Sequence, residues 1–183
     1  MNNFKDIDKK DKKENRVKVF LKDIATVLIS SIILAFVVGN FIRFSTVIGH
    51  SMDNTLFDGE RLLVNRQAYR NNTPERGDIV IIERNDLSIK YLVKRVIAVE
   101  GDSLEIKNNV VYLNDEPLVE DYILEDMVTD DLEKIVIPEG KIFVMGDNRN
   151  NSMDSRNKII GLVDIEDELF GKAFFSISTK KSL

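Results

Sequence analysis

The pattern of apolar positions divides the chain into two unlike parts. Residues 24–42 contain no charged side chain and consist mostly of Ile, Val, Leu, Ala and Phe. Because a helix rises about 1.5 Å per residue, this run is near the shortest that crosses a hydrocarbon core of about 30 Å. The hydroxyls of Thr26, Ser30 and Ser31 can bond back to the helix backbone, which makes them tolerable in lipid. The pattern therefore predicts a transmembrane helix at residues 24–42.

Two other interpretations of this apolar run remain open. A secretory signal peptide has a shorter apolar core, and a small-x-small cleavage site would follow it, which is not found directly after residue 42. A buried helix of a soluble protein is the second alternative. The length and the lack of charge favour a membrane span over both.

Beyond residue 42 the apolar positions fall into short runs that are separated by glycines. Such runs are typical of strands, and the pair 104–107 and 110–113 around Asn108-Asn109 predicts a hairpin. The acidic, weakly patterned residues 115–134 indicate a surface excursion, and residues 166–169 suggest one helical turn. We therefore predict a mainly β, antiparallel domain at residues 43–183. Its other predicted strands are residues 79–83, 91–99, 135–137, 142–145 and 172–177.

Charge predicts the orientation of the chain in the membrane. Residues 1–23 hold eight Lys and Arg residues and five acids, whereas only Arg43 and Arg61 occur in the twenty residues after the span. By the positive-inside rule the N-terminus is cytoplasmic and residues 43–183 are extracytoplasmic. Because residues 1–23 are poor in apolar side chains, we expect a mostly disordered basic tail there. The expected location is therefore a cell membrane that the chain crosses once.

Composition excludes several classes of function. The whole chain has a net charge of −5, and the basic tail leaves the outer portion more negative still. A nucleic-acid partner would require a basic face, so none is expected. The chain has no cysteine and a single histidine, which rules out thiol chemistry and makes a metal site improbable. No cofactor is expected.

A serine and a lysine are the candidate catalytic residues. Ser51 needs a base before it can attack a carbonyl, and His50, the only histidine, points to the opposite face if the chain is extended there. Lys94 shares one face of its predicted strand with the apolar Leu92 and Val96. Burial penalises the ammonium form and can lower a lysine pKa by several units, so Lys94 can act as a base. The alternatives are an edge lysine whose amine reaches water and an ordinary exposed serine.

A dense polar loop at residues 145–156 adds support for this chemistry. Ser152 is suited to orient a neutral lysine amine. Asp154 and Arg156 are suited to form an ion pair that stiffens the loop, because arginine presents a fork of donors. The alternative is an Asn-rich turn without a role in catalysis.

Taken together, these segments resemble the bacterial type I signal peptidases of the Gram-positive type. Four sequence boxes carry the resemblance in the family's order, and it covers nearly the whole chain. No single box is decisive, but four boxes in the same order and register distinguish the resemblance from a chance match. The boxes are Ser51–Leu56, Arg76–Val80, Lys94–Ile97 followed by Gly101-Asp102, and Gly146–Arg156.

The resemblance implies a fold, an activity and roles for individual residues. The fold would be the antiparallel Ser-Lys protease fold. The activity would be that of a membrane-bound serine endopeptidase, whose partners are the lipid bilayer and exported preproteins cut at Ala-x-Ala-like sites. Ser51 would be the nucleophile, Lys94 the base, and the Ser51 N–H an oxyanion donor. Ser152, Asp154 and Arg156 would support the lysine, and Val47, Met52, Leu56 and Val93 would line shallow pockets for small side chains.

Three positions depart from the pattern of the family. Gly49 stands where some members carry a serine hydroxyl as a second oxyanion donor, which leaves that donor unassigned. Asn54 replaces a proline, and Glu100 also stands where a proline is frequent. If backbone freedom at Asn54 loosens the site, a proline there should raise activity or stability.

The departures keep other functions open. A specialised signal-peptidase-like protein for pilus assembly is the alternative, either as a pilin-specific peptidase or as a non-catalytic chaperone. A self-cleaving repressor with the same Ser-Lys chemistry would need a DNA-binding segment in place of the membrane span, and residues 1–42 offer none.

Overall fold

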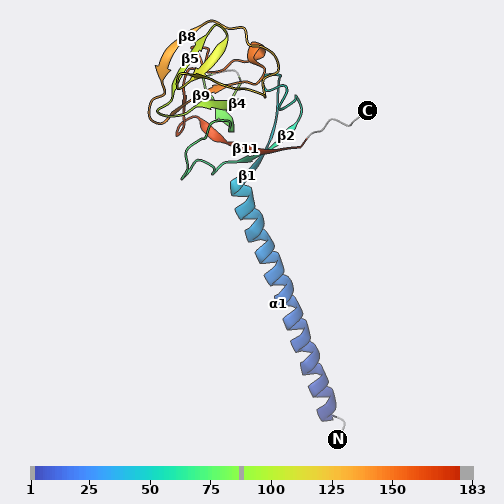
Figure 1. The fold of residues 1–183 in the computed structure, drawn as a ribbon. Coiled ribbons are helices and arrows are strands. Elements are labelled where there is room, and N and C mark those ends of the chain that lie inside the picture. Colours follow the sequence, from blue (N-terminus) through green and yellow to red (C-terminus); the bar gives the residue numbers. More distant parts are fainter. Residues whose placement is uncertain (1–2, 87–88, 178–183) are drawn as a thin grey trace, which may run out of the picture. The chain divides into compact units, whose positions relative to one another are not determined.

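The structure is a computed structural model that describes residues 3–86 and 89–177. The chain separates into two compact units, residues 1–41 and residues 42–183. Among the described residues, the first unit is one helix from residue 3 onward, and the second consists mainly of antiparallel strands (Figure 1). The prediction of a mainly β protein with one N-terminal apolar helix is therefore confirmed.

The helix α1 (Asn3–Phe41) contains a segment that is suited to a membrane. Its part Asn15–Phe41 reaches a mean hydropathy of 2.3 and spans about 40 Å at the usual helical rise. Thr26 and Ser31 donate their hydroxyls to carbonyl oxygens one turn earlier, and Asn40 donates its amide to Phe36 in the same way. These polar groups are thus satisfied within the helix, as an environment without water requires. The helix is compatible with membrane anchoring.

Both ends of α1 differ from the sequence prediction. The helix begins at Asn3, so the disorder expected for residues 1–23 is not seen from that residue onward. Lysine and glutamate are good helix formers, and an existing helix extends by adding turns without a new nucleation step. At the other end, α1 stops at Phe41, and Ile42, which was assigned to the span, begins the first strand.

Two antiparallel sheets form the second unit over its described residues, 42–86 and 89–177. The larger sheet has seven strands in the order β1-β2-β11-β3-β4-β9-β10, and the smaller has four in the order β7-β6-β5-β8. Figure 1 shows β4 beside β9 and β5 beside β8. The strands of the larger sheet are β1 (Ile42–Thr46), β2 (Arg61–Asn65), β3 (Ile79–Glu83), β4 (Tyr91–Ala98), β9 (Lys141–Met145), β10 (Val163–Asp164) and β11 (Leu169–Ile177). Those of the smaller are β5 (Ser103–Lys107), β6 (Val110–Leu113), β7 (Glu116–Pro117) and β8 (Leu132–Val136).

Most predicted strands are present with small shifts at their ends. The hairpin β5–β6 turns at Asn108 and Asn109, whose φ angles of 52° and 65° are those of a two-residue turn that asparagine tolerates. The strand expected at residues 135–137 is β8, which starts earlier, at Leu132. No helical turn forms at residues 166–169, because residues 166–168 lie in a turn and Leu169 already begins β11. The apolar pattern of the sequence did not predict β1, β2 or the two-residue strands β7 and β10.

The packing of the large sheet explains where the candidate residues lie. Lys94 is on β4, between β3 and β9, and its Cα is paired with that of Val80. Met52 and Leu56 come from the turn that joins β1 to β2. Both are buried in a cluster with Ile81 of β3. The Ser51 turn is thus fixed to the sheet by its own apolar side chains.

Candidate active site

Ser51 and Lys94 meet although 43 residues separate them in the sequence. Lys94 Nζ lies 2.7 Å from Ser51 Oγ. Ser51 starts a tight turn in which the Leu56 N–H donates to the Met52 carbonyl at 2.8 Å. His50 Nδ1 lies 3.1 Å from an Asp53 carboxylate oxygen, so the imidazole pairs with that carboxylate. The amine of Lys94 is therefore the basic group that contacts the serine hydroxyl.

Burial changes the acidity of Lys94. The residue is 2% exposed, and desolvation of its ammonium lowers its pKa from 10.5 to about 8. The charges of Asp154 and Asp147 act in the opposite direction, whereas the charge of Arg156 lowers the pKa further. Near neutral pH a useful fraction of Lys94 is therefore neutral and able to accept a proton.

A pocket of about 510 Å³ opens beside the two residues. Ser51 and Lys94 line it together with Val47, Met52 and Val93, three of the four residues expected to receive small side chains. The lining is mainly apolar. It is completed by Thr46, Ile48, Gly49, His50, Ile89, Lys90, Tyr91, Leu92, Asn151 and Met153.

Leu56 is not brought to this pocket, contrary to the expectation from the sequence. It is 4% exposed and packs in the cluster that also holds Val64 and Ile81. The turn that begins at Ser51 places Leu56 against the large sheet. Leu56 therefore packs the Ser51 turn against the core of the domain and does not line the pocket.

The polar loop after β9 is held by a buried ion pair. Arg156 donates from Nε and Nη2 to the two carboxylate oxygens of Asp154 at 2.8 and 2.9 Å. The same carboxylate accepts the Gly146 N–H at 3.0 Å. Burial alone would raise the pKa of Asp154, but these bonds, that from Arg156 foremost, outweigh it and lower the pKa. The carboxylate therefore stays charged and fixes the loop beside Lys94.

Ser152 lies close to the Asp154–Arg156 ion pair. Its hydroxyl oxygen is buried and has no partner at hydrogen-bond geometry within the described part of the chain. It lies near enough to Asp154 to contribute slightly to the lowered pKa of that carboxyl. A buried hydroxyl without a partner is costly, which is typical of a group reserved for a role in the working site. The expected contact with Lys94 stays a prediction.

A second network joins the Ser51 turn to the loop, and sequence reasoning had given it no role. Arg95 donates to both oxygens of Asp147, at 2.8 and 2.6 Å, and the Thr55 hydroxyl donates to the same buried carboxylate. The next residue, Asn148, donates its N–H to the Ser51 carbonyl at 3.1 Å. These residues lie inside the matched boxes, but their partners are distant in the sequence, and no local pattern pairs them.

Comparison with known proteins shows the family of the chain. Residues 20–178 match the model of a family described as "Signal peptidase, peptidase S26". The chain belongs to this signal peptidase family. It is 38% identical over 164 residues to signal peptidase I of Bacillus licheniformis, which covers 84% of this chain and 87% of that protein. It is 40% identical over 176 residues to signal peptidase IB of Staphylococcus aureus, with coverage of 86% and 89%.

A solved structure is also similar. It is a signal peptidase I from Enterococcus faecalis, 29% identical, with a TM-score of 0.47 over 55% of this chain and 97% of the other. The family match and the two sequence relatives identify the chain as a peptidase of signal-peptide processing.

Asn54 stands where the family pattern has a proline, and its backbone and side chain both fit the turn after Ser51. Its φ angle is 87°, whereas proline is locked near −65°. Its side-chain amide donates to the carbonyls of Tyr122 and Ile123 at 3.1 and 3.2 Å. The expectation that proline at position 54 would raise activity or stability is therefore wrong for this conformation, since proline would forfeit both the angle and the two bonds.

Gly49, the other departure close to Ser51, provides no second oxyanion donor. It has no side chain, and its N–H is already donated to Asp58 Oδ1 at 2.8 Å. Its φ angle of 92° is one that residues with side chains rarely adopt. Gly49 thus shapes the turn that presents Ser51, and the second donor stays unassigned.

Proposed function

We propose that this chain is a membrane-anchored serine endopeptidase that removes signal peptides from exported preproteins with a Ser51–Lys94 dyad. The observation that carries the proposal is the 2.7 Å contact between a buried lysine amine and the serine hydroxyl. A buried lysine of lowered pKa beside a hydroxyl supplies both the nucleophile and the base of acyl transfer. The family membership supports the same reaction.

In the proposed mechanism, Lys94 moves each proton. Its neutral amine takes the proton from Ser51 Oγ as this oxygen attacks the scissile carbonyl carbon. The Ser51 N–H stabilises the resulting oxyanion. The Lys94 ammonium then protonates the leaving amine, and the acyl-enzyme remains. Lys94 next deprotonates a water molecule, which hydrolyses the ester and restores the hydroxyl of Ser51.

The supporting residues would keep Lys94 ready for both half-reactions. Asp154 and Arg156 hold the loop through two hydrogen bonds, and Ser152 carries a free buried hydroxyl beside it. We propose that this hydroxyl orients the lysine amine when substrate closes the site. Val47, Met52 and Val93 would form the shallow apolar walls that admit only small side chains at positions −1 and −3 of the substrate.

The apolar helix would set the compartment. Asn15–Phe41 is long and apolar enough to cross a bilayer, and the basic residues before it favour a cytoplasmic N-terminus. The catalytic domain would then work at the outer surface of the membrane, where preproteins emerge.

The proposed function is tested with full-length protein in detergent and a preprotein that carries an Ala-x-Ala site. We expect cleavage after the second alanine, and a drop of at least about 100-fold when that alanine is replaced by phenylalanine, because the larger ring meets the pocket wall. Product masses identify the cleaved bond. Equal cleavage of both substrates would exclude steric selection, and cleavage of the alanine substrate by Ser51→Ala would exclude the proposed mechanism.

The activity should rise with pH and reach half of its maximum near pH 8. Burial lowers the pKa of Lys94 to about 8, and only the neutral amine can take the serine proton. The measurement is kcat/KM from pH 6 to pH 10. His50→Gln is measured in parallel, because it removes the only imidazole of the chain. A profile that is flat over this range, or one whose rising limb disappears in His50→Gln, would contradict Lys94 as the base.

A further inference from the structure

The acidic excursion at residues 115–134 contains a segment that forms hydrogen bonds with the elements around Ser51. We call residues 120–126 the strap. Asn54 of the nucleophile turn donates to the Tyr122 and Ile123 carbonyls, and the Leu124 N–H donates to the Asp147 carbonyl at 3.1 Å. On the far side of the loop, Asn150 donates its amide to Glu125 at 3.0 Å. The strap therefore bonds both the Ser51 turn and the loop after β9.

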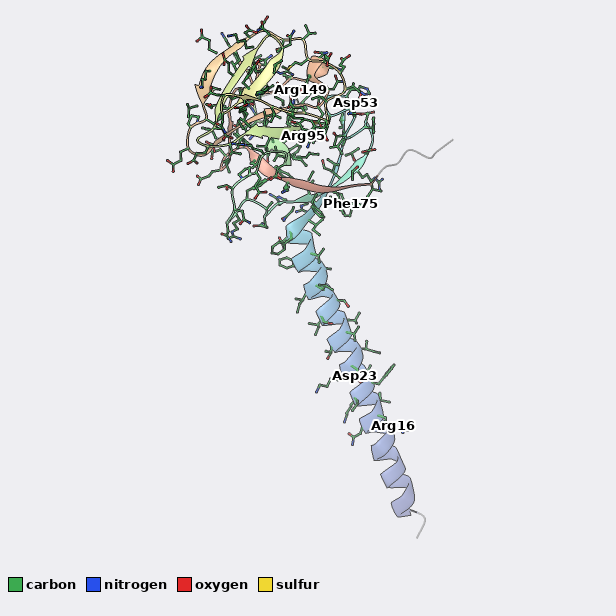
Figure 2. The ribbon with its side chains drawn as sticks, in the orientation of Figure 1. Arg16, Asp23, Asp53, Arg95, Arg149 and Phe175 are labelled. Carbon is green, nitrogen blue, oxygen red and sulfur yellow. The ribbon has the colours of Figure 1, made fainter. Side chains whose placement is uncertain are left out.

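Tyr122 lies against two arginines. The guanidinium of Arg95 is 4.0 Å from the centre of the Tyr122 ring, and that of Arg149 is 5.9 Å from it. Both arginines belong to the β domain, on β4 and on the short helix η1 (Arg149–Asn151) (Figure 2). The Tyr122 ring shields the Arg95 guanidinium from water. This shielding strengthens the ion pair between Arg95 and Asp147.

Glu120 of the strap forms an ion pair with Arg149. Arg149 donates from Nη1 to Glu120 Oε2 at 2.8 Å and from Nη2 to Glu120 Oε1. The side chains are 0% and 8% exposed, so each charge depends on the other for its partner. Tyr122 donates its hydroxyl to the same carboxylate at 2.7 Å. Arg149 also donates Nε to the Gly146 carbonyl, which ties the pair to the loop that contacts Ser51.

The contacts form a continuous path from the strap to the nucleophile. Arg95, covered by Tyr122, holds Asp147, and the neighbouring Asn148 donates to the carbonyls of Ser51 and His50 at 3.1 and 3.0 Å. These two bonds fix the peptide group that carries the Ser51 N–H, the proposed oxyanion donor, and the peptide group that follows it. None of the strap residues lines the pocket.

We propose that Glu120 and Tyr122 are positioning residues that hold the Ser51 turn and the Asn148 loop in the geometry of acylation. The proposal rests on the proposed Ser-Lys function and assigns a catalytic purpose to a segment outside the four boxes. Because no strap residue lines the pocket beside Ser51, loss of the strap should lower kcat and leave KM nearly unchanged.

Tyr122→Ala tests the strap most directly. We expect kcat to fall about 30-fold and KM to change by less than about threefold, because a small displacement of reacting groups is costly in rate. Tyr122→Phe keeps the ring over Arg95 and should retain kcat within about threefold. Val119→Thr is the matched control, since this neighbour is 90% exposed. All rates are taken per folded molecule, well below the melting temperature of each variant.

A second variant tests the bonds from the nucleophile turn. Asn54→Gly preserves the positive φ angle but removes the donor to Tyr122 and Ile123. We expect kcat to fall about 10-fold, again at nearly constant KM. Glu120→Gln keeps the shape of the side chain but removes the charge opposite Arg149. The kcat of this variant should also fall.

A readout without turnover separates the strap from the chemistry. Hydrogen exchange of peptides that cover residues 50–57 and 146–151 should accelerate in Tyr122→Ala and remain unchanged in Val119→Thr. If wild type cleaves, Ser51→Ala does not, and Tyr122→Ala matches Val119→Thr in kcat and exchange, the strap proposal is wrong while the proposed function stands. If wild type cleaves no preprotein, the function fails, and unchanged exchange in Tyr122→Ala would then overturn the strap on its own.

Discussion

Ser51→Ala and Lys94→Met should each lower preprotein cleavage by about 10⁴-fold or more while the domain stays folded. In both variants the proton transfer between Nζ and Oγ, now 2.7 Å apart, has lost one partner. Catalytic groups that act as a unit are not additive, so the double variant should be no worse than either single one. The measurement is the initial rate of precursor cleavage by purified protein in detergent.

The choice of methionine at position 94 makes the test specific. Methionine fills the space of the lysine stem but has no amine, and Lys94 is only 2% exposed. Since burial disfavours the ammonium of Lys94, its removal should leave the melting temperature unchanged or raise it. Ser103→Ala and Lys141→Met are matched controls on β5 and β9 and should cleave like wild type. Cleavage by Lys94→Met within about tenfold of wild type would exclude this lysine as the base.

Gly146→Ala should be the second most damaging substitution. A Cβ at this position would lie 2.3 Å from both the Ser51 carbonyl oxygen and Ser152 Oγ, far inside contact distance. The Ser51 carbonyl is backbone and is held by Asn148, so the nucleophile turn or the loop must move by about 1 Å. A displacement of this size costs about 100-fold in rate, and overpacking costs about 1–3 kcal/mol of stability.

Gly171→Ala supplies the matched control for this clash. A Cβ there would lie 2.6 Å from the Asn65 carbonyl oxygen, between β11 and β2, and Gly171 does not line the pocket. Both variants should melt at lower temperature, but only Gly146→Ala should lose kcat per folded molecule. Equal kcat values for the two variants would mean that the close approach of Gly146 to Ser51 serves packing alone.

The sequence by itself determined the features that depend on local pattern. An uncharged apolar run predicts the helix, because a membrane span needs nothing beyond length and hydrophobicity. Alternation and β-branched side chains predicted β3 and β4, and the asparagine pair predicted the turn at Asn108. The spacing of the boxes indicated the family. Each of these signals lies within a few residues of the feature that it predicts.

Only the tertiary structure decided how these segments are combined. Ser51 and Lys94 approach each other because β4 is a central strand and the Ser51 turn packs onto the same sheet through Met52 and Leu56. The pKa of Lys94 depends on that burial, which no neighbour in the sequence reports. The resemblance to the family implied a place for Leu56 in the pocket, whereas the turn that begins at Ser51 packs this side chain in the core.

The strap shows why the remaining features lay beyond the sequence. Residues 115–134 are acidic and without period, so they were assigned to the surface. Glu120 is nevertheless buried against Arg149, and Tyr122 covers Arg95. The φ angle of 87° at Asn54 likewise belongs to a turn whose side chain bonds residues 68 and 69 positions away. A charge or an amide does not reveal its partner when that partner is distant in the chain, because pairing depends on the fold that brings the two together.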